Sequence, residues 1–403
     1  MSNHFFYLDS SPRATGEGAL TGTRIAVQSN ISVRDWSTTA GSLALENYTA
    51  LEDATVVERI RSQGGVIVGS IRTSELGFGL RDDGGEAVLR EDQTDALIST
   101  DFLGESRITA ADAGVFGFKP TYGVVSRFGL IGLIPSMESY GVASASPRTI
   151  AALMDGISGP DKRDFSMSDR SKPDFLLKEG KTPGVVKAGV PAEAMAILTD
   201  EERQVYREGL NKLSACGVAV SEVSLPEFEL FSLVHNVVGS VEASSSAGKY
   251  DGVRYGHRAQ GTKNWNDMYL KSRGEAFGTL VKSYLFQGAY FQFENYEIFE
   301  KAGRIRARLV KGMNDLLDKV DVLVLPSKRM PFEARRAETV ADVYNAFSLT
   351  LPANVAGLPV LQVPGFIMNG TQDLGMQLIG PAFGDAGLLG LADHLSQCKG
   401  ANE

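Results

Sequence analysis

Apolar and polar positions alternate along the chain in a pattern that predicts an α/β fold. Residues 23–28 and residues 66–69 are short apolar runs of strand length. Between them, residues 56–60 place apolar side chains at helical spacing, and Asp53 stands where a capping residue would precede that helix. Strand, helix and strand at this spacing predict a parallel βαβ unit near the start of the chain.

Further elements follow by the same reasoning. A capping box, Thr199-Asp200-Glu201-Glu202, predicts the start of a helix with Tyr206, Leu210 and Leu213 on one face. Polar composition predicts loops over residues 8–22 and 165–182. The remaining segments predict helices over 149–156 and up to Leu317, and strands over 184–191 and 320–326.

Charge and composition narrow the classes of partner. The net charge of −9 and the pI near 5.2 oppose direct binding of a nucleic-acid backbone, which requires a basic surface. We expect no membrane association, because there is no leader-like start and no apolar run of spanning length. Cys216 and Cys398 lack metal-type spacing, and we interpret them as thiols of a reducing compartment. A cytoplasmic protein is the expectation.

The stretch G-V-F-G-F-K-P-T-Y-G-V-V-S-R over residues 114–127 resembles the amidase signature family. Glu242 to Arg258 is similar to one branch of it, the A subunits of glutamyl-tRNA(Gln) amidotransferase. The resemblance implies one α/β/α domain over residues 1–403 with a mixed central sheet. Within it, we expect an irregular N-terminal segment over 1–22, a degenerate signature core over 23–164, and the remainder of the domain over 165–403.

The catalytic positions of that family are replaced here. The family loop reads D-T-G-G-S-I-R with the serine as nucleophile, and ungapped alignment places Asp101 to Arg107 on it. Glu105 then stands at the nucleophile, and bulky Phe102 and Leu103 stand where the family has a threonine and a glycine of the oxyanion loop. Gln28 falls on the lysine that serves as catalytic base, and an amide has no useful basicity near neutral pH. Gln28 and Glu105 are therefore predicted to be vestigial.

The relay serine of the family is also missing. Its loop ends in G-G-S-S-G-G-S, whereas here most of that loop is deleted between Leu80 and Arg81. No serine occurs between Ser74 and Ser99, and Gly84-Gly85 is the candidate remnant of the motif.

A ligand pocket is expected around the altered loop. The resemblance places Arg306 on an arginine that holds the carboxylate of glutamine, and Phe347 on an aspartate that holds its amine. Carboxylate binding is therefore expected to survive better than recognition of an amino group. The candidate pocket residues are Phe102, Leu103, Gly104, Ser106, Arg107, Tyr250, Arg306 and Phe347.

Two hypotheses for function remain open. In the first, the chain is a non-hydrolytic paralogue of the amidotransferase A subunits that binds a small carboxylate or amide ligand, a partner protein or another copy of itself. In the second, an enzyme uses rebuilt chemistry centred on Glu105, because a buried carboxyl group can act as an acid or base. A relic Glu105 that forms a salt bridge with Arg107 or another cation is the simpler interpretation of that residue.

Metal and cofactor signals are weak. Asp82, Asp83, Glu86 and Glu105 could together hold a hard cation, but a solvated acidic turn explains the first three equally well. The four histidines match no metal or triad spacing, and neither G-x-G-x-x-G nor a P-loop occurs in a strand-to-helix context. We therefore predict no metal and no cofactor.

Overall fold

A mixed sheet of eleven strands forms the centre of the molecule. The structure, a computed structural model, describes residues 4–81, 83–170, 172–177, 186–370 and 372–400. The strands, in their order across the sheet, are β1 (Phe5–Leu8), β3 (Val66–Ile71), β2 (Arg24–Gln28), β4 (Ala96–Asp101), β6 (Ser139–Ser144), β5 (Phe116–Lys119), β10 (Val360–Val363), β13 (Met376–Ile379), β9 (Val322–Pro326), β7 (Val186–Pro191) and β8 (Val218–Val223). A separate hairpin pairs β11 (Met368–Asn369) with β12 (Gln372–Asp373).

Parallel pairing is confined to the two ends of the large sheet. Strand β2 pairs in parallel with both β3 and β4, and β7 does so with β8 and β9. The strands between β4 and β9 pair antiparallel, as does β1 with β3. The mixed α/β sheet expected from the sequence is confirmed.

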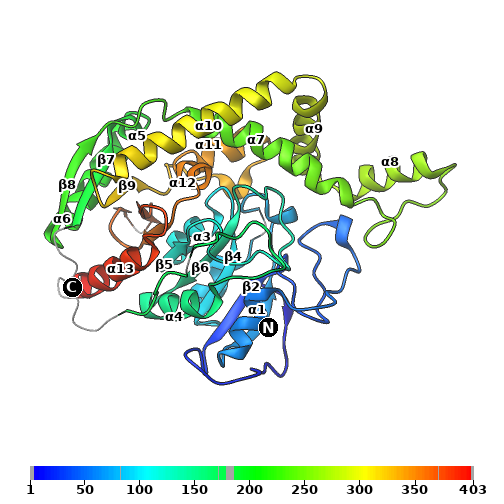
Figure 1. Cartoon of the computed structure of the whole chain (residues 1–403), viewed down its shortest axis with the longest axis horizontal. Coiled ribbons are helices and arrows are strands. Elements are labelled where there is room, and N and C mark those ends of the chain that lie inside the picture. Colours follow the sequence, from blue (N-terminus) through cyan, green and yellow to red (C-terminus); the bar gives the residue numbers. More distant parts are fainter. Residues whose placement is uncertain (1–3, 82, 171, 178–185, 371, 401–403) are drawn as a thin grey trace.

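Helices cover the sheet and extend beyond it (Figure 1). On one side α1 packs on α4, which packs on α13, while α3 packs on β4, β5, β6 and β10. A helical group of α7, α9, α10 and α12 adjoins them, and α8 extends outward from it at the right of Figure 1. The helices are α1 (Thr55–Ser62), α2 (Gly85–Arg90), α3 (Glu105–Ala113), α4 (Pro147–Ile157), α5 (Ala192–Ala196), α6 (Asp200–Ala215), α7 (Leu230–Ser246), α8 (Trp265–Ala276), α9 (Thr279–Phe293), α10 (Tyr296–Leu317), α11 (Val340–Phe347), α12 (Leu351–Ala356) and α13 (Asp385–Gly400).

Most of the elements predicted from the sequence are confirmed. The first βαβ unit consists of β2, α1 and β3, and α1 buries Val56, Val57 and Ile60. Helix α6 begins at the predicted capping box, in which the Thr199 hydroxyl accepts from the backbone N–H of Glu202. The ends of two predicted segments, residues 178–182 and 184–185, lie outside the described residues.

Two local predictions are wrong. The segment expected to be irregular contains β1, whose Phe5 and Leu8 pair with Ile71 and Gly69 of β3. Asp53 does not cap α1, because its carboxylate accepts from the Arg34 N–H and from the Arg61 guanidinium, and Ala54 occupies the N-cap. A carboxylate engaged by two such donors is directed away from the helix start.

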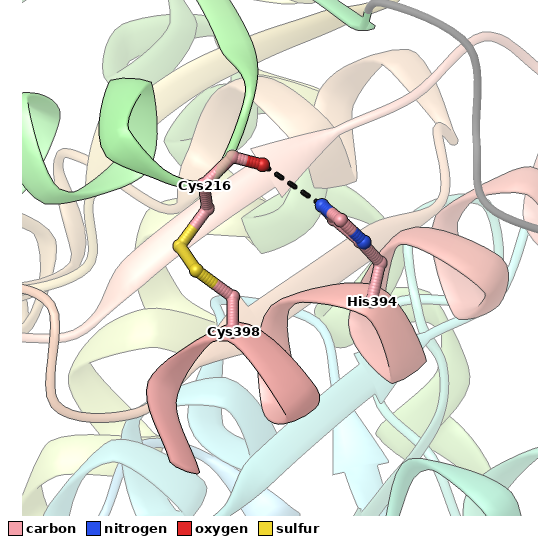
Figure 2. Close-up of a disulfide and its surroundings, with 3 residues drawn as sticks. All are labelled: Cys216, His394 and Cys398. Carbon is pink, nitrogen blue, oxygen red and sulfur yellow. Dashed lines mark hydrogen bonds between the residues drawn. A yellow bond between two sulfur atoms is a disulfide. The ribbon is translucent and has the colours of Figure 1, made fainter. Parts of the chain in front are cut away.

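The two cysteines are joined, which contradicts their interpretation as thiols. Cys216 follows the last residue of α6, and Cys398 lies in α13 near the end of the chain. Their sulfur atoms are 2.08 Å apart, and the His394 ring of α13 lies 2.8 Å from the Cys216 carbonyl oxygen (Figure 2). The cysteine count therefore gives no support to a reducing compartment, since disulfides persist mainly in oxidising ones.

Candidate functional site

The turn before α3 places Glu105 at the first residue of a helix and buries it. Gly104 precedes it with φ of 122°, a conformation that glycine adopts readily, and a Cβ atom there would collide with the Thr350 side chain. This turn directs the backbone N–H groups of residues 102, 103 and 104 toward one point. The Glu105 side chain, 1% exposed, lies at that point.

The Glu105 carboxylate is held by backbone donors. Its Oε2 accepts from the N–H groups of Phe102 at 3.1 Å, Leu103 at 2.8 Å and Gly104 at 3.1 Å, and Oε1 accepts from Gly79 at 3.4 Å. Burial and the nearby Asp101 charge raise the pKa of Glu105 to about 8, although the backbone hydrogen bonds act in the opposite direction. The donors available to an oxyanion in this loop are thus occupied by the side chain of the chain itself.

Arg107 does not pair with Glu105, so the expected salt bridge between these two residues is wrong. Its guanidinium donates to both carboxylate oxygens of Asp101, at 2.9 and 3.0 Å, and Ser106 donates to Asp101 at 2.6 Å. Burial raises the pKa of Asp101, but the Arg107 charge and hydrogen bonds outweigh it and hold that pKa at about 2. Arg107 also contacts Gln377 and Asn354, so this cluster ties α3 to α12 and β13.

Gln28 is fixed at both ends of its amide. Its Oε1 accepts from the backbone N–H and the hydroxyl of Thr100, at 2.8 and 2.9 Å. Its Nε2 donates to Asp83 at 2.8 Å, and Asp83 also accepts from the Gly85 N–H at 2.8 Å. Asp83 directly precedes Gly84-Gly85, so a carboxylate lies beside Gln28 next to the candidate remnant of the serine motif. The sequence analysis considered Asp83 only as a cation ligand, and its position next to the two glycines is the feature that could have pointed to a partner of Gln28.

The proposed acidic cation site is not assembled among the described residues. Asp83 binds Gln28, Glu86 pairs with Arg90 and Arg335, and Glu105 binds backbone N–H groups. Asp82 lies outside the described residues. Where the structure is described, it contains no group of three or more His, Cys, Asp or Glu side chains arranged to hold a metal ion.

Aromatic side chains fill the space in front of the altered loop. Phe78 stacks on Phe102 and on Tyr284, with ring centroids 6.1 and 4.5 Å apart. Phe102, Leu103 and Phe347 are fully buried, which agrees with a pocket filled by bulky residues.

His235 belongs to this buried cluster, although its sequence context gave no signal. It lies 2.7 Å from the Phe102 carbonyl oxygen and 2.9 Å from the Tyr344 hydroxyl, which lies 2.7 Å from that of Tyr284. Burial lowers the pKa of His235 to about 3, so the ring is neutral at pH 7. The cluster holds the turn of residues 102–104 in place.

The remaining predicted pocket residues are separated from this loop or already engaged. Arg306 donates to the Ser136 hydroxyl at 2.8 Å, to the Ser136 carbonyl at 2.9 Å and to the Val355 carbonyl at 3.1 Å. Tyr250 is buried against Tyr255 and Phe277. The structure thus gathers Phe102, Leu103 and Gly104 around Glu105, places Ser106 and Arg107 on Asp101, and places Arg306 and Tyr250 in other contacts.

A cleft of about 840 Å³ opens beside Phe78, which forms part of its wall. Its lining combines the cations Arg72 and Arg81, the acids Glu75 and Glu338, and the N-terminal residues of α9. Arg81 follows Leu80, where we expect from the sequence that most of the family loop is missing. Neither Glu105 nor Gln28 lines this cleft.

Comparison with known proteins shows the family to which the chain belongs. The chain matches the Amidase family over residues 7–83 and 84–389, and it belongs to that family. Within the family it is similar to the A subunit of glutamyl-tRNA(Gln) amidotransferase from Pediococcus pentosaceus, with 34% identity over 90% of this chain and 80% of that protein. The corresponding protein of Haloarcula marismortui is 32% identical over 94% of this chain and 96% of its own length.

A solved structure shows the same fold. The crystal structure of the A subunit of glutamyl-tRNA(Gln) amidotransferase from Thermotoga maritima superposes with a TM-score of 0.79 and 26% identity, covering 98% of this chain and 87% of that one. The chain therefore has the amidase signature fold. In the part of the chain that the structure describes, no helix has both the length and the apolar character needed to cross a bilayer.

Proposed function

We propose that this chain is a non-hydrolytic member of the amidase family, related to the A subunits of glutamyl-tRNA(Gln) amidotransferase. The observation that supports this most directly is the Glu105 carboxylate bound to three consecutive backbone N–H groups. An acyl substrate would have to displace a buried side chain before its oxyanion could find donors. Even then, Gln28 offers no base. Loss of a nucleophile or base alone costs on the order of a millionfold in a serine hydrolase.

The second hypothesis, rebuilt chemistry at Glu105, has one observation in its favour. A carboxyl group with a pKa of about 8 could act as a general acid near neutral pH. However, such an acid must reach its substrate, and Glu105 is 1% exposed beneath the stacked rings of Phe78 and Phe102. We therefore favour the non-hydrolytic function.

Ammonia release distinguishes the two. Purified protein and its Glu105→Ala variant would be assayed with glutamine, asparagine and a panel of primary amides. We expect no turnover above the buffer rate in either protein. Turnover in the unmodified chain that disappears in Glu105→Ala would contradict the proposal and make Glu105 the centre of an enzyme.

We further propose that a small carboxylate or amide ligand binds in the 840 Å³ cleft instead of at Glu105. Arg81 offers donors for a carboxylate, while Phe6 and Phe78 offer apolar surface. L-glutamate and L-glutamine would be titrated in a thermal-shift assay against the unmodified chain and Arg81→Ala. A rise in Tm that is weakened in Arg81→Ala is expected. A rise that Arg81→Ala leaves unchanged would contradict this location.

A further inference from the structure

Helix α9 exposes an unusual stripe of large aromatic side chains. Phe286, Tyr290 and Phe293 follow one another at the i, i+4, i+7 spacing that keeps them on one helix face. Their exposed fractions are 73%, 53% and 74%. Soluble monomers rarely leave contiguous aromatic surface of this kind in water, and such surfaces mark contacts with other molecules.

The two ends of this stripe carry opposite charge. At the N-terminal end of α9 stands the arm, defined here as residues 249–275, which has six Lys or Arg and three Asp or Glu in a chain whose net charge is −9. At the C-terminal end stands the corner, residues 290–300, which has three Glu and no Lys or Arg. The arm ends one turn before α9 begins, and the corner joins α9 to α10. Figure 1 shows both in the upper right of the molecule.

Both ends also carry exposed apolar side chains. In the arm, Trp265 is 58% exposed and Leu270 is 76% exposed, and in the corner Tyr296 is 53% exposed. From the N-terminal to the C-terminal end of α9, the surface therefore begins with the basic arm, continues with the aromatic stripe and ends with the acidic corner, and exposed apolar side chains lie at both ends. The fifteen residues of α9 separate the two charged ends by about 22 Å, from a rise of 1.5 Å per residue.

A face with this order is complementary to itself when one copy is turned around. We propose that two copies of this chain associate through antiparallel packing of their α9 helices around a two-fold axis. The aromatic stripes meet at the centre, and the basic arm of each copy meets the acidic corner of the other. Such an isologous contact satisfies both charged ends at once, as closed two-fold dimers require. This inference does not depend on the proposed non-hydrolytic function.

Charge reversal on the two ends tests the arrangement. One variant, Glu294→Lys with Glu300→Lys, makes the corner basic; Glu294 is the C-cap of α9, where a cation is compatible with the helix dipole. The other variant, Arg254→Glu with Lys263→Glu, makes the arm acidic. Both pairs are exposed, so we expect the fold to persist. Molar mass would be measured by sedimentation equilibrium over a concentration series on the full chain.

The unmodified chain should dimerise, each variant alone should dissociate at least tenfold more readily, and the equimolar mixture should recover the dimer. Recovery in the mixture identifies the arm-to-corner pairing, because only the mixed pair again joins opposite charges. Phe293→Ser should weaken the dimer, whereas Phe165→Ser, which removes a fully exposed aromatic side chain elsewhere, should not.

Three outcomes would overturn the proposal. The first is an unmodified chain that stays monomeric at concentrations up to ~100 µM, which would leave less than about 5.5 kcal/mol of association free energy. The second is a dimer that neither charge variant weakens, and the third is a mixture that stays monomeric. Co-sedimentation of a monomeric chain with vesicles of anionic phospholipid, lost in Arg254→Glu with Lys263→Glu, would assign the face to a lipid surface instead.

Discussion

At the scale of single residues, internal hydrogen bonds hold the loop that precedes α3. Glu105 satisfies three backbone donors, and Gln28 links Thr100 to Asp83. Glu105 and Gln28, which we expect from the sequence to stand at the family's nucleophile and base, accept or donate hydrogen bonds within the chain. These bonds join β2, β4 and the start of α3, so both residues contribute to the fold.

Glu105 should make the stability of the protein depend on pH. Its folded pKa of about 8 lies above the ordinary value of 4.5, so its stabilising contribution is complete below pH 4.5 and is lost as the pH rises through 8. The loss amounts to at most about 5 kcal/mol, at 1.4 kcal/mol per pH unit. We expect Glu105→Gln, which does not titrate, to flatten the decline of the unfolding free energy between pH 5 and 8 in urea titrations.

The control for this experiment is Glu17→Gln, which neutralises an exposed carboxylate between β1 and β2 and should leave the pH profile unchanged. The three N–H donors favour the ionised form of Glu105, in opposition to burial. If they prevailed, the unmodified chain would gain stability relative to Glu105→Gln as the pH rises. That result would contradict the raised pKa.

At the scale of elements, the disulfide joins two parts of the chain that the sheet does not pair directly. Cys216 ends α6, which packs on β8 at one edge of the sheet, while α13 packs on α4 and β10. The bond closes a sequence separation of 182 residues. In the chain-entropy account, a cross-link over a loop of this length restricts the unfolded state more strongly than one over a short loop.

We expect removal of this bond to destabilise the protein without changing its fold. Cys216→Ser with Cys398→Ser should lower the free energy of unfolding by about 2–5 kcal/mol in urea denaturation. The unmodified chain in reducing buffer should reach the same midpoint as the double variant, which is unaffected by the reductant. A double variant as stable as the oxidised chain would show that the cross-link carries no stability.

At the scale of the whole molecule, the sequence predicted the helices and strands better than the contacts within the candidate site. The βαβ unit, the capping box of α6 and the end of the helical region at Leu317 depend on local periodicity and capping, so they could be recognised without a structure. Strand β1 could not, because the pairing of Phe5 with Ile71 is a contact between distant residues. The same limit applied to the cysteines, whose pairing depends on how α6 and α13 come together.

Within the candidate site, the sequence drew attention to Glu105 and Gln28 but not to the partners of these residues. The alignment placed Glu105 in the loop before α3, yet Arg107 turned to Asp101 because the helix start directs the two side chains apart. His235 had no local motif, since its partners Phe102 and Tyr344 come from distant segments.

The disulfide also determines how the protein behaves after proteolytic cleavage between residues 216 and 398. The arm is exposed at Arg254 and Arg258, which makes it a natural point of attack for trypsin. A cut there separates Cys216 from Cys398 along the backbone, but the sulfur bridge still holds the two pieces. Nicked protein should therefore migrate as one species on a non-reducing gel and as two on a reducing gel, and the fragments could never part by dissociation alone. The disulfide and the backbone between residues 216 and 398 together form a covalent loop, so one cut within this loop leaves the chain in one covalent piece.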